Sequence, residues 1–339
     1  MRSILRNSYR STERFFIKRA NIGAFRFVAT QMAARDLRRE AAAVVWGQYF
    51  SLHGDDRAEL TAIRRDVHRI EKGLVMRPRR VPFGKDYVPA LVESIARQID
   101  RDALPPEDLA WANDVLSCYF DVTSEVSDDW VAAARTGFKA LRINALGQGL
   151  VPAPRSQAPE SDVSIDALEY LAIRRRSVRW FKPDPVDREA VDRALRVAGQ
   201  SPSACNRQNI RFHLLFGPEH TEPVLQTVGG TRGFASQVPA AAVVIGRLAG
   251  YRHTFDRHAI YVDGGLASMS FLFALETLGL SSCCINWPDV ASRYDAIRKH
   301  VALAPDEQVV MLIAFGHADP DGLVPSSHKR GIAYLRTRA

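Results

Sequence analysis

Residues 174–181 of the chain read Arg-Arg-Arg-Ser-Val-Arg-Trp-Phe, and residues 201–209 read Ser-Pro-Ser-Ala-Cys-Asn-Arg-Gln-Asn. Arginines at the close of a predicted helix can offer guanidinium groups to a phosphate, or can satisfy the free carbonyls of their own helix end. In the second stretch, small residues let a planar ligand approach, and Asn206 and Gln208 offer paired donors and acceptors. An ordinary Ser/Pro/Asn loop has the same composition, so neither stretch alone decides between ligand binding and local structure.

Two further stretches follow along the chain. Residues 279–287 read Gly-Leu-Ser-Ser-Cys-Cys-Ile-Asn-Trp, and their small side chains could let the backbone amides reach a ligand. The adjacent cysteines are expected to be buried small side chains rather than a redox pair. The last stretch, Gly316-His317-Ala318-Asp319-Pro320, precedes the basic pair Lys329-Arg330 by about a dozen residues.

The residues around these stretches predict an α+β arrangement. Ser164 and Asp187 are suited to cap helices that begin at residues 165 and 188. The segment from Asp263 to Leu278 is apolar nearly all round and stops at Gly279, which predicts a helix buried in a core or a subunit interface. Short buried strands are predicted at residues 212–216, 240–245 and 309–315.

Taken together, in this order and at this spacing, the four stretches resemble the nitroreductase family, over about residues 165–330. The resemblance implies an α+β fold with a mixed sheet flanked by helices. It also implies a homodimer with FMN at the interface, and hydride transfer from NAD(P)H to a second small-molecule substrate. Asp263 would open the long interface helix.

The resemblance also implies a set of FMN-binding residues, while no catalytic residue can be assigned from it. The segment between Phe216 and Tyr261 is shorter than in many members, so a helical lid over the flavin is expected to be reduced or missing. The implied ligands are Arg175, Arg176, Ser177, Arg179, Pro202, Ser203, Asn206, Gln208, Cys284, Ile285, Lys329 and Arg330.

The first 150 residues carry a different pattern. From about Ala34 to Leu150 apolar residues recur at helix spacing and no segment is typical of a strand, so a mostly helical region is expected. Its charged segment His68–Gly84 is interpreted as a helix that ends at Gly73 and a surface loop, or as a site for an anionic ligand. We expect a helical region at 1–150, a Pro-rich linker at 151–163 and an FMN-binding domain at 164–339.

Charge is concentrated at the N-terminus. Residues 1–39 hold ten Lys or Arg and two acidic residues, so this arm carries as much net charge as the whole chain, which is +8. Arg2, Arg6, Arg10, Arg14 and Lys18 recur every four residues and could form a basic helical stripe. Such an arm could contact a membrane surface or an acidic partner, or could be solvated. Nucleic-acid binding is not expected, because no recognition motif accompanies the charge.

Other classes of function lack support. The four cysteines have no zinc-ligand spacing, and no run of about 18 apolar residues suggests a membrane span. There is no Walker loop, no Ser-His-Asp order and no G-x-G-x-x-G, so nicotinamide is expected to visit the flavin pocket in a ping-pong mechanism. We expect a cytoplasmic enzyme, peripheral at a membrane if the arm binds lipid. The alternative is a non-catalytic flavin-binding or scaffold protein that the basic arm recruits.

Overall fold

The computed structural model describes residues 15–336 apart from 142, 144–146 and 252, together with Thr12. Residues 1–11 and 13–14, which hold four of the five members of the predicted basic stripe, lie outside the described residues. The predicted arm therefore stays a prediction.

The C-terminal part is built on one antiparallel sheet with the strand order β1-β2-β4-β3. The two central strands are largely buried, which explains why their sequences are continuous apolar runs. The sequence predicted three of the strands and missed β3, which lies at the edge of the sheet. The strands are β1 (Ile210–Phe216), β2 (Ala240–Arg247), β3 (Ser281–Asn286) and β4 (Glu307–Gly316).

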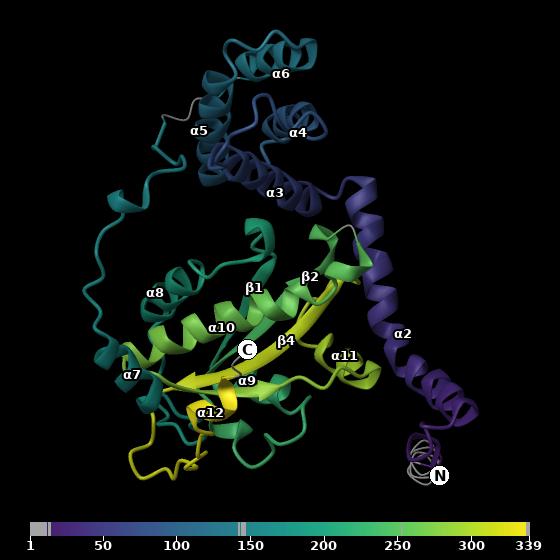
Figure 1. Ribbon diagram of the computed structural model, residues 1–339. Coiled ribbons are helices and arrows are strands. Elements are labelled where there is room, and N and C mark those ends of the chain that lie inside the picture. The colour runs from purple at the N-terminus through teal and green to yellow at the C-terminus, as the bar shows by residue number, and fades with distance from the viewer. Residues whose placement is uncertain (1–11, 13–14, 142, 144–146, 252, 337–339) are drawn as a thin grey trace.

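Helices cover both faces of this sheet. On one face, α8 and α10 bury Val191, Phe271 and Leu275 against the strands. On the other, α9 and α11 pack around Val243 and Leu312 (Figure 1). The predicted α+β fold with helices flanking the sheet is confirmed. The sheet itself is not mixed as the resemblance implied, because its strand pairs are all antiparallel and the parallel pairing of Ser177 with Ser282 is an isolated bridge. The helices are α7 (Ile165–Arg174), α8 (Arg188–Ala198), α9 (Pro218–Leu225), α10 (Ala259–Thr277), α11 (Ala291–Ile297) and α12 (Ile332–Leu335).

The N-terminal part is helical, as predicted, and has a core of its own. Ile70, Leu91, Val115 and Tyr119 are completely or almost completely buried in this core. Helix α2 runs from this region down the side of the sheet, and Gly47 of α2 packs so closely on Leu248 that a Cβ atom would lie 2.8 Å from the Leu248 carbonyl carbon (Figure 1). The helices are α2 (Gly23–His53), α3 (Asp56–Leu74), α4 (Val88–Asp100), α5 (Pro106–Val122) and α6 (Asp129–Ala140).

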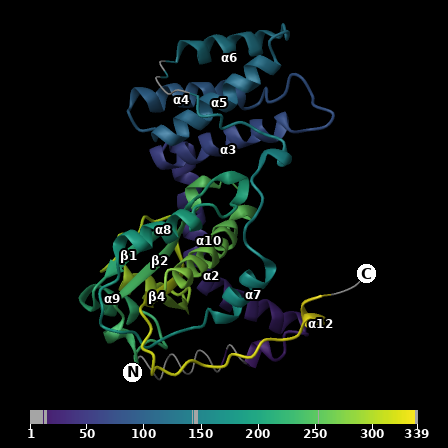
Figure 2. The same cartoon turned by 90° about the vertical axis from the view of Figure 1, so that its left-hand side faces the viewer.

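A Pro-containing segment connects the two parts. From residue 147 the chain passes down the outside of the molecule in an exposed, irregular conformation. It forms one short 3-10 turn at Arg155–Gln157 and then enters α7 (Figures 1 and 2). The division of the chain into domains at residues 151–163 stays a prediction.

Two helix boundaries differ from the prediction. Helix α3 does not end at Gly73 but continues to Leu74. Position 73 has no room for a side chain, because a Cβ atom there would be 2.1 Å from the Phe83 ring. Helix α10 begins at Ala259, so Asp263 lies in its second turn and does not open it.

The stretch Thr254–Thr277, which includes α10, is long and apolar enough to cross a bilayer by length and composition alone. From the sequence we expected no stretch of this kind, and by length and composition that expectation was wrong. Half of the stretch is buried inside the protein, where Phe271 and Leu275 pack on the sheet. The core therefore accounts for the buried half of its apolar residues, while Val262, Leu266 and Met269 stay exposed.

Candidate functional site

The Arg-rich stretch at residues 174–181 lies against the edge strand β3. Val178 donates its backbone N–H to the Ser282 carbonyl at 3.0 Å, and Ser177 and Ser282 form a parallel bridge. Ser282 is 1% exposed, and its hydroxyl has no hydrogen-bond partner among the described residues. The structure thus brings Ser177 and its neighbouring arginines together with β3, the strand that contains Cys284 and Ile285.

The C-terminal tail returns to the same place. Lys182 donates its N–H to the His317 carbonyl at 2.8 Å, and Asp319 donates to the Trp180 carbonyl at 3.0 Å. Further on, the Arg176 guanidinium donates to the Pro325 carbonyl at 2.7 Å. The tail therefore passes along the Arg-rich stretch four residues before Lys329.

Lys329 and Arg330 themselves are exposed. The Arg330 guanidinium stacks over the Tyr334 ring at 3.8 Å from its centroid, within the tail. The structure places this predicted phosphate-binding pair four residues after the Pro325 contact with Arg176, but it shows no contact between the pair and the Arg-rich stretch.

The two adjacent cysteines differ from each other. Cys283 is buried, and burial raises the pKa of its thiol against the opposing effect of the Arg179 and Arg175 charges. Cys284 is exposed, so the expectation that both thiols are buried was wrong for it. The reason is β3 itself: successive side chains of a strand point to opposite faces, and this strand was not predicted.

The second predicted stretch forms a tight loop at the far end of the domain, before β1. Cys205, Asn206 and Gln208 all have φ angles between 51° and 53°, in the left-handed region that residues other than glycine rarely adopt. The Ser203 hydroxyl accepts from the Gln208 N–H at 3.0 Å, and the Gln208 amide donates to the Asn206 side chain at 3.0 Å. Pro202 and Gln208 are exposed on the outer face of the loop.

Asp263 of α10 anchors this loop from below. Both of its carboxylate oxygens accept from the Ala204 N–H at 3.1 Å, and the Tyr251 hydroxyl donates to one of them at 3.0 Å. Burial raises the pKa of Asp263, and these two donors and the nearby Arg207 charge oppose that effect. The sequence marked Asp263 only as a helix start and gave no signal for Tyr251.

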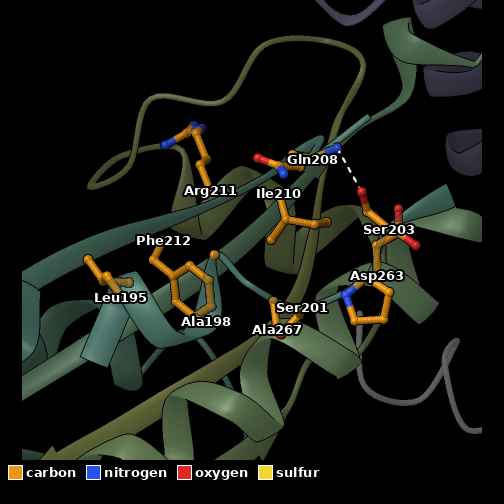
Figure 3. Close-up of a pocket in the computed structure, with 12 residues that line it drawn as sticks. Leu195, Ala198, Ser201, Ser203, Gln208, Ile210, Arg211, Phe212, Asp263 and Ala267 are labelled. Atoms are coloured by element: carbon orange, nitrogen blue, oxygen red, sulfur yellow. Dashed lines mark hydrogen bonds between the residues drawn. The ribbon is translucent and has the colours of Figure 1, made fainter. Parts of the chain in front are cut away.

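A cavity of about 220 Å³ opens beside the loop. Apolar side chains of α8, β1 and α10 form its floor, and Ser203 and Gln208 stand at its rim, joined by their hydrogen bond (Figure 3). Its lining includes Leu195, Ile210 and Phe212 on the apolar side and Asp263 on the polar side. Such a cavity suits one edge of a flat, mostly apolar ring with polar groups on its periphery.

The two groups of predicted site residues lie at opposite ends of α10. The Pro202–Gln208 loop is held by Asp263, whereas the Arg-rich stretch is tied to the other end, where Arg174 donates to Glu276 at 2.9 Å. Thirteen residues of helix separate these two carboxylates, which corresponds to about 20 Å at 1.5 Å per residue. One protomer therefore does not bring the two groups together.

Comparison with known proteins identifies the C-terminal part. The model of the nitroreductase family matches residues 172–227 and 223–317, a range that includes the Arg-rich stretch, the loop and β3. Over these residues, which make up less than half of the chain, the protein is similar to the nitroreductase family. No curated protein sequence matches the chain.

Solved structures with a similar arrangement include an FMN-dependent nitroreductase from Clostridium difficile, 22% identical, which covers 46% of this chain and 91% of that one with a TM-score of 0.41. A nitroreductase-like family protein from Bacillus cereus is 17% identical and covers 54% of this chain and 99% of that one, with a TM-score of 0.43. The family match therefore covers the C-terminal part, and the helical region at 23–140 lies outside it.

Proposed function

We propose that the protein is an FMN-dependent oxidoreductase that takes hydride from NAD(P)H and reduces a second small-molecule substrate in a ping-pong mechanism. The observation that carries this proposal is the family match over residues 172–317, which contains both groups of predicted flavin ligands. The C. difficile protein to which the chain is similar is itself described as FMN-dependent.

The residues present fit FMN. Arg175 and Arg179 lie close enough to Cys283 to influence its thiol, so two cations surround the edge of β3 next to the unpartnered Ser282 hydroxyl. This donor set suits an anionic, polar ligand. The loop at the other end of α10 offers the amides of Asn206 and Gln208 beside an apolar cavity, which suits a ring system.

When bound, FMN would supply a ring that accepts hydride and passes it on, chemistry that the side chains alone lack. The chain's residues would bind and orient it. Arg175, Arg176 and Arg179 would neutralise its negative charge, with Lys329 and Arg330 at the phosphate. Ser203, Asn206 and Gln208 would position the ring edge.

We propose further that two protomers complete each site. On α10, Val262, Leu266 and Met269 are 61%, 44% and 37% exposed, so none of the described residues of the same chain covers this apolar stripe at helix spacing. A two-fold axis near Met269, at the C-terminal end of this stripe, would make the two α10 helices antiparallel and place the Asp263 end of one beside the Glu276 end of the other. The loop of one protomer would then meet the Arg-rich stretch of its partner.

The test is the purified protein itself. We expect it to be yellow, to release about one FMN per chain on denaturation, and to lose its visible absorbance within seconds when NADH or NADPH is added without oxygen. A colourless protein that takes up no added FMN would refute the proposal. Tight FMN binding without reduction by either nucleotide would instead favour a non-catalytic flavin-binding role.

A further inference from the structure

Helix α3 of the N-terminal region lies along the loop that we assign to the flavin. The Thr61 hydroxyl donates to the Asn209 side chain at 2.8 Å, and the Arg64 guanidinium donates to the Asn206 carbonyl at 3.2 Å. Two turns further along, the Lys72 amine lies 3.9 Å from the Cys205 sulfur. Positions 61, 64, 68 and 72 share one face of a helix, so this face follows the second half of the loop, residues 205–209.

The contact is close and specific. Gly250, in the turn after β2, has no room for a side chain, because a Cβ atom would lie 2.0 Å from the Asn209 amide and 2.5 Å from the Thr61 methyl group. The Arg247 side chain, which precedes this turn, bonds Asp55 at the start of α3 at 2.8 Å. The helical region is therefore docked on the loop by fitted contacts rather than joined to the domain only by its linker.

The charges on this face are not equally available. Arg64 forms an ion pair with Asp108 of α5, and His68 bonds Glu71 at 2.9 Å. Lys72 is exposed and has no ion pair with any of the described residues. Its amine is thus an uncompensated cation of this face, and it lies beside Cys205 in the middle of the loop.

We propose that α3 is part of the active site and that Lys72 selects a second substrate that carries a negative charge, such as a carboxylate, sulfonate or phosphate group, beside the part that is reduced. This assignment rests on the proposed function. Thr61 and Arg64 position the loop, while the exposed Lys72 amine lies against the Cys205 sulfur at its middle.

The experiment compares two quinones that differ in charge. The FMN-loaded protein is reduced with dithionite and mixed in a stopped-flow instrument with 1,4-naphthoquinone-2-sulfonate or with uncharged 2-methyl-1,4-naphthoquinone. The quinone gains two electrons and two protons, and the flavin returns to its oxidised form. The ratio of the two second-order rate constants measures the preference for the anion, independently of the nicotinamide donor.

We expect Lys72→Met to lower this ratio by about three- to tenfold at low ionic strength. A partly screened positive charge increases the rate at which an anionic quinone meets and binds the site by about this factor. The decrease should become smaller in high salt. Lys72→Arg, which keeps the charge, should retain the ratio. Lys139→Met removes an exposed lysine from α6 of the same region and should leave the ratio unchanged.

An unchanged ratio in Lys72→Met, with FMN still bound, would overturn this assignment and leave the proposed function intact. An equal decrease in Lys139→Met would also overturn it, because the effect would then come from the general charge of the helical region. A protein that binds no FMN would remove the proposed function and this assignment together.

Discussion

Cys205, Asn206 and Gln208 show how single residues prepare the loop for a ligand. A left-handed conformation costs on the order of 1–3 kcal/mol for each residue other than glycine. Three such residues lie within four positions, so the surroundings must hold them. Asp263 accepts from the Ala204 N–H, and Arg64 donates to the Asn206 carbonyl, so these two side chains supply such contacts. Strain of this kind is maintained where the positions of backbone and side-chain groups matter, which agrees with a binding role.

Arg330 gives a prediction at the same scale. If it meets the FMN phosphate, Arg330→Ala should weaken FMN binding by about 1.5–3 kcal/mol, the usual range for a hydrogen bond to a charged group, or about ten- to a hundredfold in Kd. Riboflavin lacks the phosphate, so its affinity should barely change. Fluorescence titration of the apoprotein with both ligands measures the difference.

The matched control is Arg336→Ala, which removes another arginine from the same exposed tail. It should leave both affinities alone. If Arg330→Ala weakens riboflavin and FMN equally, or weakens neither, then the tail does not bind the phosphate and the placement of Lys329 and Arg330 is wrong.

At the scale of elements, the sequence predicted what local chemistry determines. The Ser164 hydroxyl accepts from the Ala167 N–H, and the Asp187 carboxylate accepts from the Glu189 N–H, as expected of capping residues. Strand β3 was missed because Ser281–Asn286 is built from small residues without clear alternation. Its strand conformation comes from pairing with β4 and with Ser177, which are distant in the sequence.

Gly73 allows a test of helix packing at this scale. Alanine normally stabilises a helix interior relative to glycine by about 1 kcal/mol. At Gly73 its methyl group would meet the Phe83 ring, so Gly73→Ala should instead destabilise the helical region, by about 1–3 kcal/mol. Gly137→Ala in α6 is the control, because its Cβ atom would lie 3.3 Å from a Val92 methyl group that can adjust.

Urea unfolding followed by circular dichroism measures both variants. We expect Gly137→Ala to be neutral or stabilising and Gly73→Ala to shift the transition to lower urea. Equal stability of the two variants would mean that the Phe83 ring is free to move, and that the close packing of the charged segment His68–Gly84 on its own helix has no energetic consequence.

At the scale of the whole molecule, the sequence predicted a helical part and an α+β part but not how they meet. Thr61, Arg64 and Lys72 belong to an amphipathic helix pattern that would look the same on any surface helix. Their partners, Asn209, Asn206 and Cys205, lie more than 130 residues away. Contacts of this kind have no local signal, so the sequence did not connect the helical region with the loop. It offered only the alternative of an anion site at His68–Gly84, the segment that contains Lys72.

The separation of the two groups of proposed flavin ligands gives the last prediction. If a two-fold axis pairs the exposed stripe of α10 with its copy, Leu266 is buried at the interface, and Leu266→Glu would place two unpaired charges there, one from each protomer. Burying such charges costs several kcal/mol each, so the variant should be a monomer at micromolar concentration. Because each site needs the loop of one protomer and the Arg-rich stretch of the other, FMN should be lost in the same variant. Sedimentation velocity recorded at the flavin and protein wavelengths reports both properties at once.

Val81→Glu, an equally drastic change at a position 47% exposed in the helical region, should leave both the dimer and the flavin unaffected. Arg330→Ala should weaken FMN binding but leave the dimer intact, because Arg330 does not belong to the α10 stripe. A Leu266→Glu monomer that binds FMN with unchanged affinity would show that one protomer holds a complete site, and the loop and the Arg-rich stretch would then have to serve different ligands. A Leu266→Glu dimer would place the interface elsewhere, because the α10 stripe could not accept two charges and remain closed.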